Sequence, residues 1–228
     1  MIVLGTGNPV AARRYFAIGY RRLPGTNVWW NNVRDDRSPE ECVMDSFRDA
    51  AAAGGSLVVA EGIPTARVRM LPLIHHPHDV LLSLDANVGL YSTRASVMTS
   101  VNGLYPRYAN LVLENSGKWW TAMVTEEAQG SESGTGGTLV GLATACRSSE
   151  TPDDEVWVDG FLHGKWLGEH WATLMQQGPL RWASTAGQFK RACARVPKQD
   201  AAKISLFQSL GFAEAVGRVV SILVVFGL

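Results

Sequence analysis

The chain has 228 residues, of which 46% are hydrophobic and 18% charged. This length and composition indicate a globular protein with a sizeable core and exclude a disordered chain. The 21 basic and 21 acidic side chains cancel, and a net charge of zero gives no reason to expect a nucleic-acid partner.

The predicted elements of the first half begin with a short strand at residues 2–5. A helix follows, with Asn8 as its cap, Pro9 in its first turn and Gly19 at its end. Further along, the sequence predicts a strand at 27–30, a helix at 38–54 that Ser38 caps, and a strand at 56–62. Residues 63–92 give no clear pattern, and 99–115 are mostly helical in character, with an interruption at Pro106.

The second half alternates more clearly between strands and helices. Two strands that are apolar on both faces flank a polar hairpin loop, which is typical of a sheet covered on two sides. After these come a strand at 155–160, a helix that ends at Gly178, a strand at 191–196, a helix that Asp200 caps and Gly211 closes, and a final pair of strands.

Three cysteines, Cys42, Cys146 and Cys193, are scattered without the spacing of a metal site. A sparse, odd set is typical of reduced thiols, and the first residues lack the pattern of a secretory signal. The apolar run at 219–228 is too short to span a bilayer and is better explained as a buried strand. The sequence therefore predicts a cytoplasmic protein with no membrane span and no metal.

One pattern occurs twice. The stretch NPVAARRYFAIGY starts at Asn8, and DAAKISLFQSLGF starts at Asp200. Each has a capping residue, an aromatic residue seven positions later (Tyr15 or Phe207), and a glycine followed by an aromatic residue after four and five more positions. A glycine followed by an aromatic residue in such a frame also occurs in other types of protein module, so the repeat is a hypothesis.

The segment from about residue 92 to the end resembles a GNAT-type N-acetyltransferase. VWVDGFLHGKWLGEHWATLM is similar to the strand, turn and helix of that family's acyl-CoA segment, and ARVPKQDAAKISLFQSLGF is similar to its later segment. The resemblance implies an α/β (α+β) fold, with a mixed, mostly antiparallel sheet and helices on both faces. It divides the chain into an N-terminal segment, 1–90, and a GNAT-like acyl-CoA-binding domain, 91–228. The first 35 residues would be part of a second, truncated GNAT copy.

The first stretch has a physical reason to bind a diphosphate. A turn that enters a helix points several backbone N–H groups at one spot, and small residues let a ligand come close. Here the turn departs from the family pattern, with His163 in place of Arg or Gln and Trp166 in place of a glycine. The residues that the resemblance assigns to the cofactor are Val158, Phe161, His163, Gly164, Lys165, Leu167, Gly168, Asp200 and Phe207.

The family's chemistry is direct attack of an amine on acetyl-CoA. It needs a backbone N–H for the oxyanion, a base for the amine proton and a donor that protonates the departing thiolate. The strand VWVDG offers the backbone group, and Glu155 or Asp159 offers the base. Phe207 stands where many members have a tyrosine, and it cannot donate a proton.

The resemblance therefore implies transfer of an acetyl group from acetyl-CoA to a primary amine of a small molecule. The alternative is a CoA-binding or degenerate GNAT module without turnover, in regulation or assembly. Neither reading calls for a nucleic acid, a membrane or a metal, and both leave a homodimer open.

Other residues have two explanations. Cys193 is an acyl-accepting thiol or a small buried residue, and His163 and His170 are acid–base groups or structural ones. Trp119, Trp120 and Trp157 line an acceptor pocket or pack in the core. A metal site at His75, His76 and His78 is less consistent with Pro77 than a solvated loop is.

Overall fold

The structure is a computed structural model. It describes residues 2–22, 28–31, 37–38, 41, 55–62, 116–125, 137–147, 153–163, 166–197, 201–215 and 221–227. Within these ranges no helix is long and apolar enough to cross a membrane. The metal site considered at His75, His76 and His78 lies outside them, as do Cys42, Gly164, Lys165 and Asp200.

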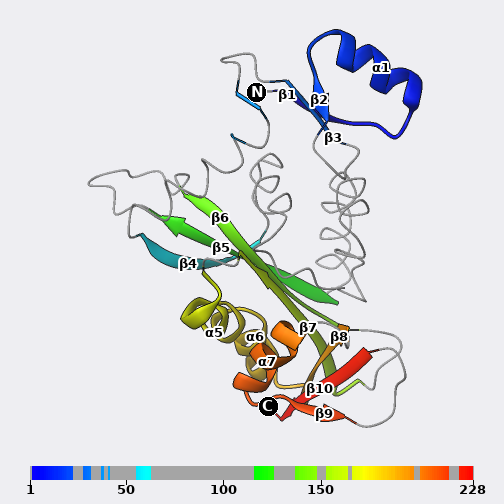
Figure 1. The fold of residues 1–228 in the computed structure, drawn as a ribbon. Helices are drawn as coiled ribbons and strands as arrows, with labels where there is room; N and C mark the ends of the chain where they lie inside the picture. The colour runs from blue at the N-terminus through cyan, green and yellow to red at the C-terminus, as the bar shows by residue number, and fades with distance from the viewer. Residues whose placement is uncertain are drawn as a thin grey trace.

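The strands form two sheets (Figure 1). A three-stranded sheet in the order β1-β3-β2 accompanies helix α1 near the N-terminus, and its elements are β1 (Ile2–Gly5), α1 (Pro9–Ala17), β2 (Arg21–Arg22) and β3 (Val28–Asn31). The larger sheet has seven strands in the order β4-β5-β6-β7-β8-β10-β9. They are β4 (Ser56–Glu61), β5 (Gly117–Thr125), β6 (Thr138–Cys146), β7 (Glu155–Leu162), β8 (Arg191–Pro197), β9 (Ala213–Ala215) and β10 (Ser221–Gly227).

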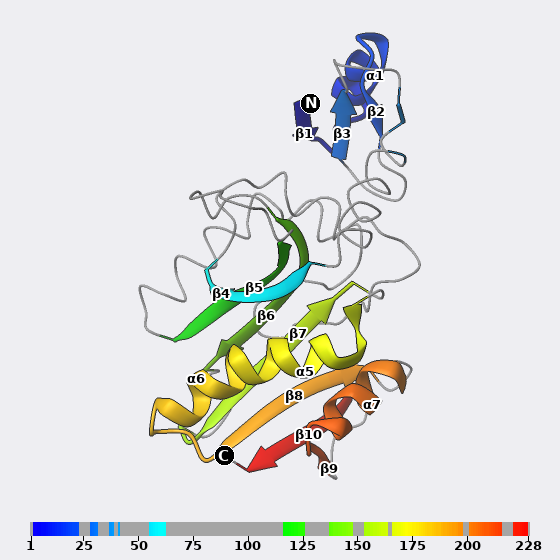
Figure 2. The same ribbon diagram turned by 90° about the vertical axis from the view of Figure 1, so that its left-hand side faces the viewer.

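Helices α5 (Gly168–Gln177) and α6 (Pro179–Thr185) lie across one face of the seven-stranded sheet, and α7 (Ala201–Ser209) lies beside α5 (Figure 2). The strand pairs are antiparallel except for β7 and β8, which are parallel. This mixed, mostly antiparallel α/β sheet confirms the predicted fold class.

The larger sheet begins earlier in the chain than the predicted division at residue 91. Its edge strand β4 comes from Ser56–Glu61 and pairs along its whole length with β5. The segment 1–90 therefore supplies a strand to the C-terminal sheet. The sequence could not show this pairing, because β4 and β5 are far apart in the chain and residues 63–92 between them give no clear pattern.

The parallel pair β7 and β8 separates toward its carboxyl ends. The ladder joins Glu155–Trp157 to Arg191–Cys193, whereas β7 runs on to Leu162 and β8 to Pro197. Beyond Trp157, β7 stays paired with β6, and beyond Cys193, β8 stays paired with β10. Figure 2 shows the two strands moving apart. We call this region, β7 from Val158 and β8 from Ala194, the β7–β8 divergence.

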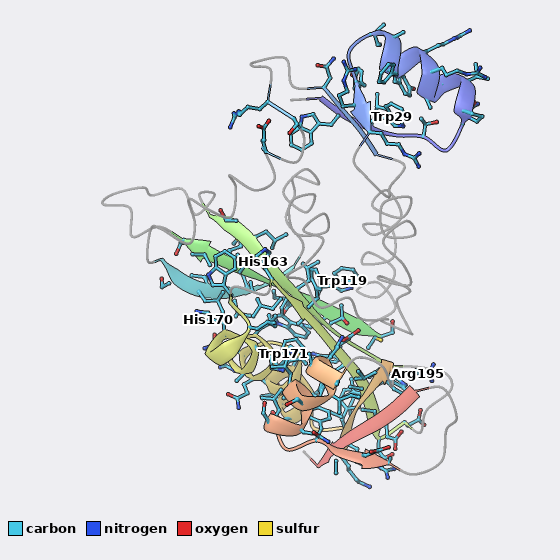
Figure 3. All side chains as sticks on the ribbon, viewed as in Figure 1. Trp29, Trp119, His163, His170, Trp171 and Arg195 are labelled. Atoms are coloured by element: carbon cyan, nitrogen blue, oxygen red, sulfur yellow. The ribbon has the colours of Figure 1, made fainter. Side chains whose placement is uncertain are left out.

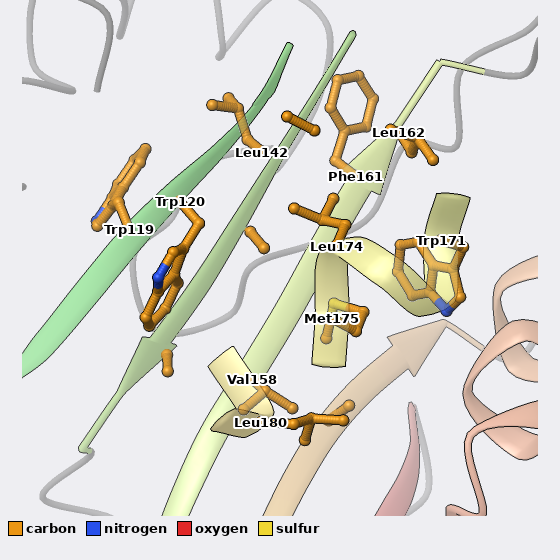
Figure 4. Close-up of a cluster of buried hydrophobic side chains, with 14 of the residues drawn as sticks. Trp119, Trp120, Leu142, Val158, Phe161, Leu162, Trp171, Leu174, Met175 and Leu180 are labelled. Carbon is orange, nitrogen blue, oxygen red and sulfur yellow. The ribbon is translucent and has the colours of Figure 1, made fainter. Parts of the chain in front are cut away.

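A large part of the core lies between the seven-stranded sheet and helices α5 and α6 (Figure 4). Trp171, Leu174 and Met175 form the buried side of α5, as their spacing of three and four residues predicts. Trp119, Trp120 and Trp157 are buried as well, which favours the packing explanation for them. Trp120 lies on this side, beside Trp182 of α6, whereas the strand register puts Trp119 and Trp157 on the opposite face of the sheet.

Gly160 allows α5 to approach β7. A Cβ atom at this position would lie 2.6 Å from Sδ of Met175 and 2.9 Å from two ring carbons of Trp171. Any side chain would therefore push the helix away from the strand. The glycine fixes the distance between the strand that carries Asp159 and the helix that starts at Gly168.

Helix α6 differs from the sequence prediction, which ended the helical pattern at Gly178. Pro179 is instead the first residue of a new helix, where its missing N–H costs nothing. The predicted helix at 38–54 is described only at its start, where Glu41 N–H donates to Oγ of Ser38 (3.2 Å) and Ser38 N–H donates to Oε2 of Glu41 (2.7 Å). This reciprocal pair is a capping box, in agreement with the predicted cap.

The segment around α1 has the same topology as the segment around α7. In both, a strand leads into a nine-residue helix, a short strand and a third strand that pairs antiparallel with the other two. The strand order is β1-β3-β2 in one and β8-β10-β9 in the other. This agrees with the predicted arrangement of residues 1–35.

The helix ends correspond as well. Tyr20 N–H donates to the Tyr15 carbonyl (3.0 Å), as Phe212 N–H donates to that of Phe207 (3.2 Å). The paired rings lie 5.7 Å and 5.0 Å apart, and the glycines before Tyr20 and Phe212 have φ of 95° and 90°. The environments differ, since Phe207 is fully buried whereas α1 has no buried residue. A truncated second GNAT copy stays a prediction.

Candidate active site

Asp159 lies on β7 inside the β7–β8 divergence, two residues beyond the last pair of the parallel ladder. Its Oδ1 accepts a hydrogen bond from the backbone N–H of Gly160 (2.8 Å) and one from Nζ of Lys203 on α7. The carboxylate side chain is 13% exposed, and Lys203 is fully buried. A carboxylate, a backbone donor and an ammonium group therefore meet where the two strands separate.

Lys203 and Phe207 occupy the same face of α7, one helical turn apart. The Lys203 ammonium lies 5.8 Å from the centre of the Phe207 ring. That ring meets Trp171 of α5 edge-on, with 5.4 Å between centroids. The sequence pattern indicated Phe207 as a site residue but not Lys203. The available signal was its position, four residues before Phe207 on the same side of the helix.

Glu155 and Asp159 do not come together. Glu155 is at the first pair of the parallel ladder, four residues from Asp159 and so about 13 Å away along the strand. Its Oε1 forms an ion pair with Nη2 of Arg191 (2.8 Å). Of the two candidate bases, Asp159 alone lies in the divergence.

The turn after β7 places its two unusual side chains inward. His163, labelled in Figure 3, is fully buried directly after β7. Its ring meets that of Trp166 edge-on, with 5.1 Å between centroids. The backbone N–H of Trp166 donates to the His163 carbonyl (2.9 Å). Trp166, in place of a glycine, is thus packed in the core rather than projecting over the start of α5.

The first turn of α5 is the candidate anion site. The helix begins at Gly168, and Leu167 before it provides no side-chain cap. Among the described residues, a Cβ at Gly168 would meet no atom within 4 Å. Since the first N–H groups of a helix have no partner within it, this end can accept an anion.

The other predicted cofactor residues are distributed between the core and the surface. Val158 and Phe161 are buried, so only their backbone is available to a ligand, and Leu167 is half-buried. Gly164, Lys165 and Asp200 lie outside the described residues.

Cys193 is buried on β8, opposite Trp157 in the closed part of the ladder. Burial raises the pKa of its thiol from 9.0 to about 12, and the charge of Glu155 adds to this effect. Since the thiolate is the reactive form, the acyl-accepting role considered for Cys193 is disfavoured.

We expect Cys193 in the native protein to resist iodoacetamide at pH 8. A thiol with a pKa of about 12 is ionised in about one molecule in ten thousand at this pH, against about one in ten for a thiol at 9.0. Mass spectrometry of the peptide, with and without urea, measures the difference. Equal rates in both conditions would contradict the buried thiol.

The same shift destabilises the fold in alkali. Above about pH 9 the unfolded chain loses this proton while the folded chain keeps it up to about pH 12. The stability that Cys193 contributes is therefore complete below pH 9 and falls through that window.

No protein-family model and no curated protein sequence matches the chain. Solved structures do. The GNAT domain of PAT from S. lividans aligns at a TM-score of 0.53 and 14% identity, over 77% of this chain and 92% of that domain. The protein yncA from Salmonella typhimurium, crystallised with its cofactor acetyl-CoA, aligns at 0.51 and 14%, over 75% and 94%.

A spermidine N-acetyltransferase from Vibrio cholerae, in complex with CoA and spermine, aligns at a TM-score of 0.50 and 13% identity. That match covers 75% of this chain and 95% of the enzyme. At these identities the comparisons establish the fold, and the chain has a GNAT-type fold.

Proposed function

We propose that this protein binds an acyl-CoA and transfers its acyl group to a primary amine of a small molecule. The observation that carries the proposal is the Asp159 carboxylate on the Gly160 N–H at the β7–β8 divergence. It places a base and a backbone donor together, directly before the turn that enters α5. The fold, and the acyl-CoA or CoA bound to proteins that share it, support the proposal.

The diphosphate of the donor would bind at the first turn of α5. Gly168 leaves space there, and the backbone N–H groups of the helix start favour negative charge. The acyl end would reach the divergence. The divergence lies near α5, because Gly160 of β7 packs closely against Trp171 and Met175 of that helix.

At the acyl carbon, the residues have distinct roles. The carbonyl oxygen of the thioester would replace the Asp159 carboxylate as the acceptor of the Gly160 N–H. This hydrogen bond would stabilise the negative charge that develops on the oxygen. The released carboxylate would then accept the proton of the attacking amine. Acetyl-CoA is the donor we favour, and a cytoplasmic location belongs to the same proposal.

A CoA-binding protein without turnover is the second candidate. Phe207 lacks the hydroxyl of the tyrosine that the resemblance leads one to expect, and in the free protein the Asp159 carboxylate already engages the Gly160 donor. Thiol release from acetyl-CoA across a panel of primary amines separates the two candidates. Release above the hydrolysis background supports the transferase, and CoA binding without release supports the second candidate.

We expect acetyl-CoA to raise the thermal midpoint. A ligand at a hundred times its Kd stabilises a protein by about 2.7 kcal/mol, or about 5–10 °C at this size. Gly168→Val should reduce the shift strongly, because its side chain stands where the diphosphate approaches, and free space around the Cβ predicts an intact fold. Ser184→Val, at an exposed position of α6, is the matched control and should keep the shift.

An unchanged midpoint with millimolar acetyl-CoA would exclude the donor site. Equal shifts for wild type and Gly168→Val would place the diphosphate elsewhere.

A further inference from the structure

Lys203 has no role in the reaction described so far. Its side chain is fully buried on α7, and its ammonium contacts Oδ1 of Asp159. Taking an ammonium group out of water is costly unless a partner of opposite charge compensates for it. A chain that keeps such a group beside the candidate base therefore calls for an explanation beyond packing.

The position of Lys203 matches a missing function. Acyl transfer from a thioester needs a donor that protonates the departing sulfur, and Phe207 cannot provide it. Lys203 is four residues before Phe207, on the same face of α7, and its Nζ is 5.8 Å from the centre of that ring. Its ammonium therefore lies beside this ring, on the side chain one turn before the position where the resemblance leads one to expect the phenol.

A lysine is chemically suited to this task. In model peptides an ammonium and a phenol lose a proton at similar pH, about 10.4 and about 10, and a thiol loses one at about 8.5. Proton transfer from an ammonium group to a newly formed thiolate is therefore uphill by only about two pKa units. It needs the donor in contact with the sulfur, and the contact with Asp159 positions the Lys203 ammonium at the divergence.

We propose that Lys203 is the general acid that protonates the departing thiolate, an assignment that rests on the proposed acyl transfer. The amine nitrogen bonds to the acyl carbon, and the carbon–sulfur bond breaks with its electron pair going to sulfur. Lys203 gives a proton to the sulfur. Asp159 takes the proton that the amine loses.

The ion pair then closes the cycle by itself. Neutral Lys203 and protonated Asp159 are left in contact, and the proton passes from the carboxyl group to the amine. The net result is movement of one proton from the acceptor amine to the CoA sulfur, with the ion pair restored. No further reactant is required.

Lys203→Met tests the assignment with acetyl-CoA and the amine that the wild type accepts. We expect thiol release to fall on the order of a hundredfold or more, while acetyl-CoA still shifts the thermal midpoint. Adding Phe207→Tyr to this variant should restore much of the loss, because it returns a proton donor one turn away. A purely structural role of Lys203 predicts no rescue by a tyrosine.

Lys203→Arg is the second variant, for the case in which Lys203→Met does not fold. It keeps a cation beside Asp159, but a guanidinium does not give up its proton. We expect acetyl-CoA binding without turnover. An arginine variant with wild-type turnover, a methionine variant with wild-type turnover, or a loss that Phe207→Tyr leaves unchanged would each overturn the assignment.

These outcomes are distinct from a failure of the proposed function. If the wild type releases no thiol with any amine, acyl transfer and the role of Lys203 both fall. If the wild type is active and the variants behave otherwise than expected, only the role of Lys203 falls.

Discussion

Asp159→Asn should lower acyl transfer on the order of a hundredfold or more and leave acetyl-CoA binding intact. The asparagine oxygen can still accept the Gly160 N–H, so the local backbone has its hydrogen bond. An amide cannot accept the proton of the attacking amine, and it no longer neutralises the buried ammonium of Lys203. The measurement is thiol release under saturating donor and amine, beside the thermal shift with acetyl-CoA.

Glu155→Gln is the matched control for this variant. Glu155 is on the same strand and also carries an ion pair, but it lies in the closed part of the β7–β8 ladder with Arg191. We expect its removal to leave turnover within a few-fold of the wild type. A large loss in Glu155→Gln together with an active Asp159→Asn would exchange the two residues and refute Asp159 as the base.

Trp171→Ala should lower the free energy of unfolding by about 3–5 kcal/mol. The side chain is 1% exposed, lies against Gly160 of β7 and meets the Phe207 ring edge-on. Its removal leaves a cavity at the point where α5, α7 and β7 meet, and the glycine provides no side chain that could move in to fill it. Urea denaturation of the wild type and the variant measures the change.

Trp182→Ala is the comparison for Trp171→Ala. Trp182, on α6, also contacts two aromatic rings, those of Trp120 and Phe189, but it is only half-buried. We expect a clearly smaller loss of stability. A cost below about 1 kcal/mol for Trp171→Ala, or one no larger than that of Trp182→Ala, would contradict the packing described for α5.

Two signals in the sequence predicted much of the fold. Helix ends depend on neighbouring residues, so Asn8 and Pro9 predicted the start of α1, and Gly19 and Gly211 predicted the ends of α1 and α7. Long apolar runs predicted β5 and β6, since strands buried on both faces have no polar side. The stop expected at Gly178 was half right, because a proline after a helix can also begin the next one.

The sequence by itself determined the order of the strands and helices in the second half and the helix caps at Asn8 and Ser38, because each depends on residues close in the chain. The class of sheet followed from the family resemblance. Only the tertiary structure decided the site. Asp159 and Lys203 are 44 positions apart, and they meet because β7 and β8 separate and α7 lies against the gap. The same strand register places Glu155 opposite Arg191 in the closed part of the ladder, away from that point. Contact between distant residues depends on how strands pair and helices pack, and no local pattern of amino acids carries that information.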